Sequence, residues 1–323
     1  MVRIHHLARE TPATSGGFRA FRPPEKVADK VTAVHSPRDR YTAVAQRCAD
    51  VVIRQYSTSF GMASRLFTPA TRPHVAAIYA WARAADEVVD GAIGERDDAQ
   101  SLIEELRDRT DRALARGFDA DPIVHAFADT ARRFGIDARL VDPFYESMAT
   151  DLRVTEHSPE SLERYIHGSA EVIGEMCMRT FSGGGLGERP GMAEGARRLG
   201  AAFQKVNFLR DVNEDWHQLG RNYLPGRDPA ALTDRDVAEL ADDVDSDLAV
   251  AGEAIARIPG RDRVAVLAAH DLFAELNRRL RAAGAAEVTA GRVRVPDAVK
   301  VRVVARAVAT GARPERTPAR TTP

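Results

Sequence analysis

The 323-residue sequence contains only two cysteines, Cys48 and Cys177. This excludes a disulfide framework and predicts reduced thiols in a cytoplasmic protein. No apolar run approaches the ~20 residues that cross a bilayer, and the first twenty residues lack the apolar segment of a secretory signal. The net charge of −1 gives the protein no electrostatic preference for binding nucleic acid. Neither an HxxxH nor an HExxH spacing occurs, which argues against a zinc site.

The apolar residues recur with the 3.6-residue period of amphipathic helices, and no segment alternates like a strand. Breaks between the expected helices coincide with glycine and proline. We therefore predict one all-α domain, a helical bundle over 39–310, between a disordered arm (1–38) and a disordered tail (311–323). The expected helices run roughly over 38–60, 70–91, 97–116, 121–134, 138–151, 158–182, 190–218, 245–258, 262–284 and 293–310.

The helix expected over 73–91 carries carboxylates on an otherwise apolar face. Ala76, Tyr79, Arg83, Asp86 and Asp90 fall in one stripe about 80° wide. Asp86 and Asp90 are four residues apart, so they stack about 6 Å apart along the axis. Two inward carboxylates repel each other and require a cation. Mg²⁺ prefers such hard oxygen ligands.

A second helix, expected over 196–218, repeats this arrangement. Lys205 and Arg210 flank its polar stripe, where they could contact the anionic partner of a metal. A single Asp-x-x-x-Asp pattern is usually a solvated helix face. Two such patterns on apolar-flanked helices indicate instead a metal–diphosphate site. The second stripe consists of Gln204, Asn207, Asp211 and Asp215, with Glu214 beside it.

At these residues the sequence resembles the squalene/phytoene synthase family of head-to-head prenyl synthases. The resemblance covers nearly all of residues 40–310 and is greatest to the actinobacterial phytoene synthases. It rests on the blocks "YSTSFGMASRLFTP" (56–69), "AAIYAWARAADEVVDG" (76–91), "YESMATDL" (145–152), "YIHGSAEVIGEMC" (165–177) and "LGAAFQKVNFLRDVNEDWHQLGRNYLP" (199–225).

The resemblance implies an isoprenoid-synthase bundle whose central cavity lies between two facing Asp-rich helices. It implies two or three Mg²⁺ ions, replaceable by Mn²⁺, bound with diphosphate by Asp86, Asp90, Asn207, Asp211 and Asp215. It implies catalytic roles for Tyr79, Arg83, Tyr165, Arg210 and Tyr223, with Tyr165 handling a proton. It implies substrate contacts for Ser57, Phe60 and Gln204.

Three positions depart from the family pattern. Glu87 stands where aspartate is common, which keeps the charge. Ser147 replaces a glycine, which predicts a small change in helix packing, and Lys205 replaces an apolar residue. None of these changes removes a motif carboxylate, so we expect activity to be retained.

The implied reaction is the Mg²⁺-dependent condensation of two geranylgeranyl diphosphates to phytoene through a cyclopropyl (prephytoene) diphosphate. NADPH is not expected. The preference for C20 substrates is argued from Ser64 and Ala76. If the helices that carry them wall the tunnel, these small residues leave its deep end open.

Two alternatives stay open. One is a C30 synthase that makes squalene, presqualene diphosphate or dehydrosqualene from farnesyl diphosphate. The other is a non-catalytic relative that acts as a binding or assembly factor. The expected partner is a prenyl diphosphate substrate, and no nucleic-acid partner is expected. A peripheral contact with the inner membrane face for product release and a downstream desaturase are compatible with the sequence.

Overall fold

The computed structural model describes residues 36–90 and 96–311. The chain divides into two compact units, Met1–Arg40 and Tyr41–Pro323, and only residues 36–40 of the first are described. The expected arm and tail therefore lie almost entirely outside the described residues. The α-helices are α2 (Pro37–Tyr56), α3 (Thr58–Ser64), α4 (Arg72–Val89), α5 (Arg96–Arg116), α6 (Pro122–Phe134), α7 (Ala138–Asp151), α8 (Pro159–Ile166), α9 (Val172–Thr180), α10 (Met192–Glu214), α11 (Asp234–Ile255), α12 (Gly260–Ala290) and α13 (Asp297–Gly311).

The prediction of an all-α fold is confirmed. Within residues 36–90 and 96–311 there is no β-strand, and Glu156 and Asn222 form an isolated β-bridge. Two π-turns interrupt the helices, η1 (His167–Glu171) before α9 and η4 (Asp215–Leu219) after α10. Short 3₁₀ turns, η2 (Phe181–Gly183), η3 (Leu186–Glu188) and η5 (Pro229–Ala231), complete the connections.

Two predicted helix boundaries were wrong. The helix expected over 38–60 breaks at Ser57, whose backbone is extended and whose hydroxyl accepts from Phe60 N at 3.1 Å, so that α3 starts anew. The helix expected over 245–258 begins at Asp234. There Thr233 and Asp236 form a capping box, which starts a helix whose first turns are largely polar.

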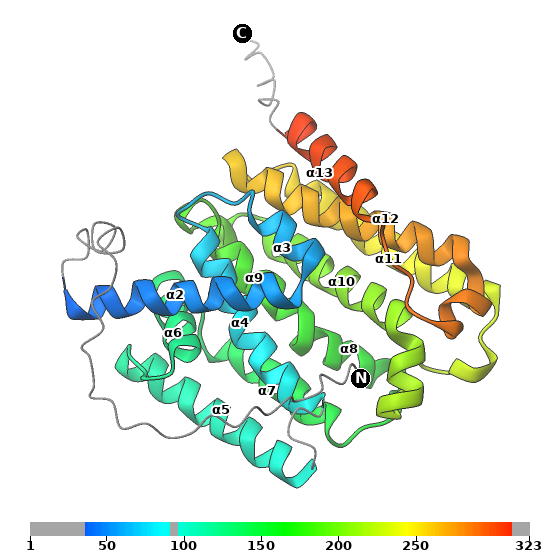
Figure 1. Cartoon of the computed structure of the whole chain (residues 1–323), viewed down its shortest axis with the longest axis horizontal. Coiled ribbons are helices and arrows are strands. Elements are labelled where there is room, and N and C mark those ends of the chain that lie inside the picture. The colour runs from blue at the N-terminus through cyan, green and yellow to red at the C-terminus, as the bar shows by residue number, and fades with distance from the viewer. Residues whose placement is uncertain (1–35, 91–95, 312–323) are drawn as a thin grey trace, which may run out of the picture. The chain divides into compact units, whose positions relative to one another are not determined.

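Helix α10 is packed on several sides. It contacts α9, α11 and α12, while α4 contacts α5, α6, α7 and α9. Figure 1 shows α12 beside α11 and α13, with α10 next to α11 and α12. Helix α5 lies away from this group, beside α6 and α7. The arrangement brings α4 and α10, the two acidic helices, to the same interior region.

Glycines permit the close approach of α10 to the segment that contains η1 and α9. A Cβ at Gly174 would collide with the Ala196 carbonyl, and a Cβ at Gly200 would collide with the Ala170 carbonyl. Backbone oxygens cannot move aside without shifting a helix. The two glycines therefore set the distance between these helices.

We expect Gly200→Ala to destabilise the protein by about 1–3 kcal/mol, because the methyl group overpacks the helix crossing. Gly252→Ala is the matched control. Gly252 lies inside α11, and its nearest neighbour for an added Cβ is His270 Nε2 at 3.9 Å. There we expect a gain of about 0.5–1 kcal/mol from the lower entropy of the unfolded chain. Urea unfolding of both variants measures the difference, and equal shifts would contradict the packing argument.

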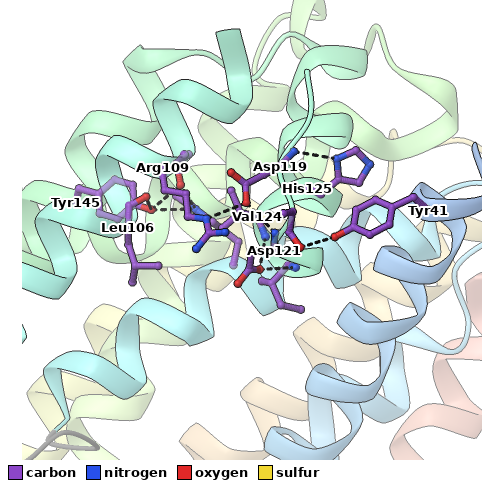
Figure 2. A network of polar contacts seen from close by, with 12 residues as sticks. Tyr41, Leu106, Arg109, Asp119, Asp121, Val124, His125 and Tyr145 are labelled. Carbon is purple, nitrogen blue, oxygen red and sulfur yellow. Dashed lines mark hydrogen bonds and ion pairs between the residues drawn. The ribbon is translucent and has the colours of Figure 1, made fainter. Parts of the chain in front are cut away.

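A polar network fixes α5 and the turn before α6 (Figure 2). Arg109 Nε donates to Asp119 Oδ1 at 2.8 Å, and Tyr41 OH donates to the Ala120 carbonyl at 2.6 Å. Asp121 Oδ1 caps α6 by accepting from Ile123 N and Val124 N. Farther along, Tyr145 OH accepts from Trp81 Nε1 at 3.1 Å, which anchors α4 to α7.

Candidate active site

A cavity of about 400 Å³ lies between the helices and follows α10 along most of its length. Other parts of the wall come from α4, α9, α11, α12 and the segment 56–67. Because Arg210 follows Met192 by 18 residues, the cavity extends for about 27 Å of helix axis. The α10 stripe consists of Met192, Gly195, Ala196, Leu199, Gly200, Phe203, Gln204, Asn207 and Arg210.

The two ends of this cavity differ in chemistry. Charged and amide side chains gather at one end, where Arg83, Asp86, Asn207, Arg210 and Arg292 line the wall. The other end is apolar, with a buried cluster that contains Phe67, Val75, Met178, Phe181, Met192, Ile258 and Val266. The cavity thus suits a ligand with an anionic head and a long apolar chain.

The first acidic motif lies where α4 ends. Asp86 lines the cavity, and burial raises its pKa to about 7, with further rises from Asp90 and Asp151 and an opposing effect of Arg83. Asp90 is the C-cap residue of α4, and burial raises its pKa as well. Arg221 Nη1 contacts Asp90 Oδ1 at 3.2 Å and its Nη2 donates to the Val89 carbonyl at 2.7 Å.

The second acidic motif lies at the end of α10. Arg210 Nε and Arg292 Nε contact Asp211 Oδ1 at 2.8 and 3.1 Å. Burial, and next Asp211, raise the pKa of Asp215 to about 8; Asp90 adds to this rise and Arg221 opposes it. The carbonyl of Asp215 also accepts from Arg221 N at 2.8 Å. Arg221 therefore contacts both motifs.

The carboxylate and amide oxygens at this end of the cavity suit a divalent cation that takes its remaining ligands from a diphosphate. Asn207 Oδ1 is buried and has no hydrogen-bond partner, an arrangement that is costly unless a ligand completes it. Among residues 36–90 and 96–311, no three Asp, Glu, His or Cys side chains converge on one point. Mg²⁺ typically uses one or two carboxylates together with phosphate oxygens, so this arrangement suits it.

A buried carboxylate that the sequence analysis did not single out lies beside these motifs. Asp151 accepts from Tyr165 OH at 2.8 Å and from Tyr223 OH at 2.7 Å. Burial raises its pKa to about 6, although Arg221 and the two tyrosines oppose the rise. Both tyrosines belong to the buried core, and neither lines the cavity. The detectable signal was an aspartate at the end of the otherwise uncharged run "SMATD".

Four residues predicted to contact substrate or the reacting groups lie on the cavity wall: Ser57, Phe60, Tyr79 and Gln204. The rings of Phe60 and Tyr79 stack with centroids 5.7 Å apart. Burial raises the pKa of Tyr79 to about 12, so its hydroxyl keeps its proton. Arg83 forms ion pairs with Asp86 and Glu87. Glu87, which stands where aspartate is common, thus supplies a negative charge beside the first acidic motif.

Ser64 and Ala76 do not belong to the cavity wall, which corrects the argument for an open deep end. Ser64 is buried and its hydroxyl donates to the Gly61 carbonyl at 3.0 Å. Ala76 packs against Ala45 and Ala49 of α2. The wall stripe of α4 consists of Val75, Tyr79, Ala82, Arg83 and Asp86, and Val75 lies about 100° around the helix from Ala76.

Three further side chains lie at or near the site, and one of them departs from expectation. Lys205 does not contact the anion site, because its Nζ pairs with Asp243 and Asp247 of α11, each at 2.7 Å. Arg292, which follows α12, lies at the cavity wall beside Asp211. Ser147 Oγ donates to the Tyr165 carbonyl at 3.1 Å, so a serine in place of the family's glycine adds a hydrogen bond between α7 and α8.

Comparison with known proteins agrees with this geometry. The chain is 30% identical over 251 residues to a phytoene synthase of Pseudescherichia vulneris, covering 71% of this chain and 80% of that protein. It is 33% identical over 180 residues to a 15-cis-phytoene synthase of Paracoccus sp. (54% and 58%). A chloroplastic phytoene synthase 3 of Zea mays is 34% identical over 202 residues (61% and 46%). The chain thus spans only about half the length of the last two relatives.

Solved structures share the fold. A dehydrosqualene synthase in complex with ligand superposes with a TM-score of 0.72 at 21% identity, covering 84% of this chain and 98% of that one. Squalene synthase HpnC from Alicyclobacillus acidocaldarius superposes with a TM-score of 0.64 at 19% identity (81% and 99%).

In the described part of the chain, no helix has the length and apolar composition needed to cross a membrane.

The family profile described as Squalene/phytoene synthase matches residues 53–298. This match spans the cavity wall from Phe60 to Arg292 and includes both acidic motifs. Members of this family are prenyltransferases. The chain belongs to the squalene/phytoene synthase family.

Proposed function

We propose that the protein is a phytoene synthase, which condenses two geranylgeranyl diphosphates head to head into phytoene through prephytoene diphosphate. The observation that carries the proposal is the cavity itself. Crowded carboxylates and an unpartnered amide oxygen stand at one end of an apolar channel that follows α10. The names of the relatives in bacteria and chloroplasts support the C20 substrate.

The residues proposed to hold the metal are those of the two acidic motifs and the amide one turn before the second. Bound Mg²⁺ would neutralise the charge that develops on the departing diphosphate. The raised pKa values of Asp86, Asp90 and Asp215 support this assignment, since burial raises each of them and the nearby arginines do not offset it. The complete set is Asp86, Asp90, Asn207, Asp211 and Asp215.

Arginines at the same end are proposed to hold the diphosphate. Arg83, Arg210 and Arg292 line the wall and carry five-donor guanidinium groups that match phosphate oxygens. Arg210 and Arg292 contact Asp211 in the structure, so binding of the metal by Asp211 would release them toward the anion. Ser57 and Gln204 supply hydrogen-bonding groups on the same wall.

The remaining wall would protect the carbocation. Phe60 and Tyr79 present stacked rings, whose faces stabilise a nearby cation by about 0.5–2 kcal/mol. The apolar side chains exclude water, which would otherwise capture the cation as an alcohol. A part for Tyr165 and Tyr223 in the final proton loss, which would require no reductant, stays a prediction: both donate to Asp151 and lie in the buried core rather than on the cavity wall.

The decisive experiment incubates the purified full-length protein and Mg²⁺ with geranylgeranyl or farnesyl diphosphate, without NADPH, and analyses hexane extracts by mass spectrometry. We expect phytoene from the C20 substrate and no product when EDTA replaces Mg²⁺. The absence of product from both substrates, in protein shown to be folded, would favour the binding-factor alternative. Calorimetry with Mg²⁺ and a non-hydrolysable prenyl diphosphate is the second discriminating measurement, because a lack of metal-dependent binding would also favour that alternative.

A C30 synthase is the second candidate. The cavity volume of about 400 Å³ lies near the lower end of the range for ligand pockets, about 300–1,000 Å³, which favours shorter substrates. In the same incubation, a C30 product alone would leave the proposed metal site standing. It would change the proposed product from phytoene to squalene, presqualene diphosphate or dehydrosqualene. Repeating the farnesyl diphosphate reaction with NADPH would separate squalene formation from the other two.

A further inference from the structure

Two phenylalanines from distant segments line the apolar end of the cavity. Phe67 follows α3, and Phe181 follows α9. Their rings stack with centroids 5.3 Å apart and planes inclined by 23°. Both line the cavity, and both are buried. Since a stacked aromatic pair is rigid and large, it forms a wall that a flexible chain cannot easily displace.

This wall stands far from the anion site. Val75 belongs to the same apolar cluster as the two rings and precedes Asp86 by eleven residues on α4, or about 16 Å of helix axis. On α10, Met192 belongs to that cluster and precedes Arg210 by 18 residues, or about 27 Å. A prenyl chain whose diphosphate is held by the arginines therefore points its tail toward Phe67 and Phe181.

One buried carboxylate holds both halves of the wall. Asp262, at the start of α12, is 2% exposed. Its Oδ1 accepts from Thr68 N at 3.1 Å, and its Oδ2 accepts from Ser182 N at 2.8 Å and from Thr71 Oγ1 at 2.8 Å. Thr68 and Ser182 are the residues that directly follow Phe67 and Phe181.

The backbone beside Phe181 is also held in an unusual conformation. Ser182 has φ 53° and ψ 30°, in the left-handed region that non-glycine residues rarely adopt. Such a conformation persists only where surrounding contacts enforce it, and the hydrogen bond from Ser182 N to Asp262 is one such contact. The position of the Phe181 ring is thus fixed by a specific interaction rather than by general packing alone.

We propose that the Phe67–Phe181 pair is the stop that limits the length of the prenyl chain, and that Asp262 is the positioning residue that keeps this stop in place. The inference rests on the proposed function and adds to it the residues that determine substrate length. It replaces Ser64 and Ala76, which lie outside the cavity wall. With the stop intact, a C20 chain fits and a C25 chain is rejected.

The test compares kcat/KM of the full-length protein for geranylfarnesyl (C25) and geranylgeranyl (C20) diphosphate with Mg²⁺. Phe181→Ala should raise the C25:C20 ratio at least about tenfold, since even one methylene changes discrimination by that order. Phe181→Leu should restore part of the discrimination. Phe118→Ala is the control, because Phe118 is a 41% exposed ring that contacts Tyr41 and His125 outside the cavity.

Asp262→Asn tests the positioning role. Asparagine keeps the shape, but its amide group opposes one of the two backbone N–H donors, so we expect a smaller rise in the C25:C20 ratio than with Phe181→Ala. A merely structural role would lower both kcat/KM values equally and leave the ratio unchanged. An unchanged ratio in Phe181→Ala and Asp262→Asn, in protein that converts the C20 substrate, overturns the inference and leaves the proposed function intact.

Binding provides a readout that is independent of turnover. Calorimetry with unreactive thio-diphosphate analogues of C15, C20 and C25 should show a sharp loss of affinity at C25 in the wild-type protein. Phe181→Ala should remove that loss. If the wild-type protein forms no product from any substrate, the proposed function fails. The length dependence of analogue binding then still confirms or refutes the stop.

Discussion

Asp86→Asn is expected to lower turnover by about 10²–10³-fold and, at the same time, to stabilise the metal-free protein at pH 8. The loss of activity follows from the proposed role of Asp86 as a metal ligand. The gain in stability follows from its environment, where burial raises its pKa to about 7 from an ordinary 3.8. The combination would separate a functional carboxylate from one that holds the fold together.

The sign of the stability effect depends on pH. Between pH 4 and pH 7 the folded protein binds more protons at Asp86 than the unfolded chain, so rising pH removes stability through this window. At pH 4 the folded state is protonated and the unfolded chain, with its ordinary pKa of 3.8, is about half ionised, so the substitution should be nearly neutral. At pH 8 we expect a gain of only about 1–2 kcal/mol, because the side chain is 39% exposed and solvent screens its charge.

Urea unfolding of the metal-free protein at pH 4 and pH 8, together with the initial rate at saturating Mg²⁺, measures both effects. Asp142→Asn is the matched control. Its side chain is equally exposed, at 39%, but it pairs with Arg107 at 2.8 Å and belongs to neither acidic motif. A loss of stability in Asp86→Asn at pH 8 would contradict the electrostatic argument, and retained turnover would contradict the metal assignment.

Asp151→Ala is expected to destabilise the protein by about 2–5 kcal/mol, since it leaves two buried hydroxyl groups without an acceptor. Tyr165 and Tyr223 both donate to this carboxylate, and both side chains are buried. Asp151→Asn keeps an oxygen that can accept from the tyrosines, so it should cost about 1 kcal/mol or less. The midpoints of urea unfolding distinguish the two variants.

A second comparison isolates the hydroxyl groups. In the Asp151→Ala background, replacing Tyr165 and Tyr223 by phenylalanine removes the unsatisfied donors and should recover part of the lost stability. Additive losses in the triple variant would instead mean that the tyrosine hydroxyls have other partners. Activity is not the readout here, because a part in the final proton loss is predicted for both tyrosines.

The all-α fold could be predicted, because amphipathic periodicity is a local property of the sequence. The convergence of the two acidic helices was implied instead by the resemblance to the squalene/phytoene synthase family. The cavity stripe of α4 could not be predicted to one residue. We anchored it on Asp86 and Asp90, yet α4 ends at Val89 and Asp90 caps it. The stripe through Val75, Tyr79 and Ala82 is rotated enough to exclude Ala76 from the wall.

Other residues escaped prediction because their roles depend on contacts between distant segments. Asp151, Arg221 and Asp262 each accept from or donate to groups that lie more than fifty residues away. Local periodicity contains no information about such pairs. The early start of α11 was different, since the capping box at Thr233 and Asp236 was readable in the sequence and was overlooked among the surrounding charges.

Helix α10 contributes to the cavity from Met192 to Arg210, so the anion site and the distant apolar end are positions on one continuous helix. An insertion or deletion of a single residue between them would rotate one end by about 100° relative to the other and destroy the shared face. Divergence among descendants of such a protein should therefore avoid indels in α10. New product lengths would arise through substitutions of bulky side chains on the other walls.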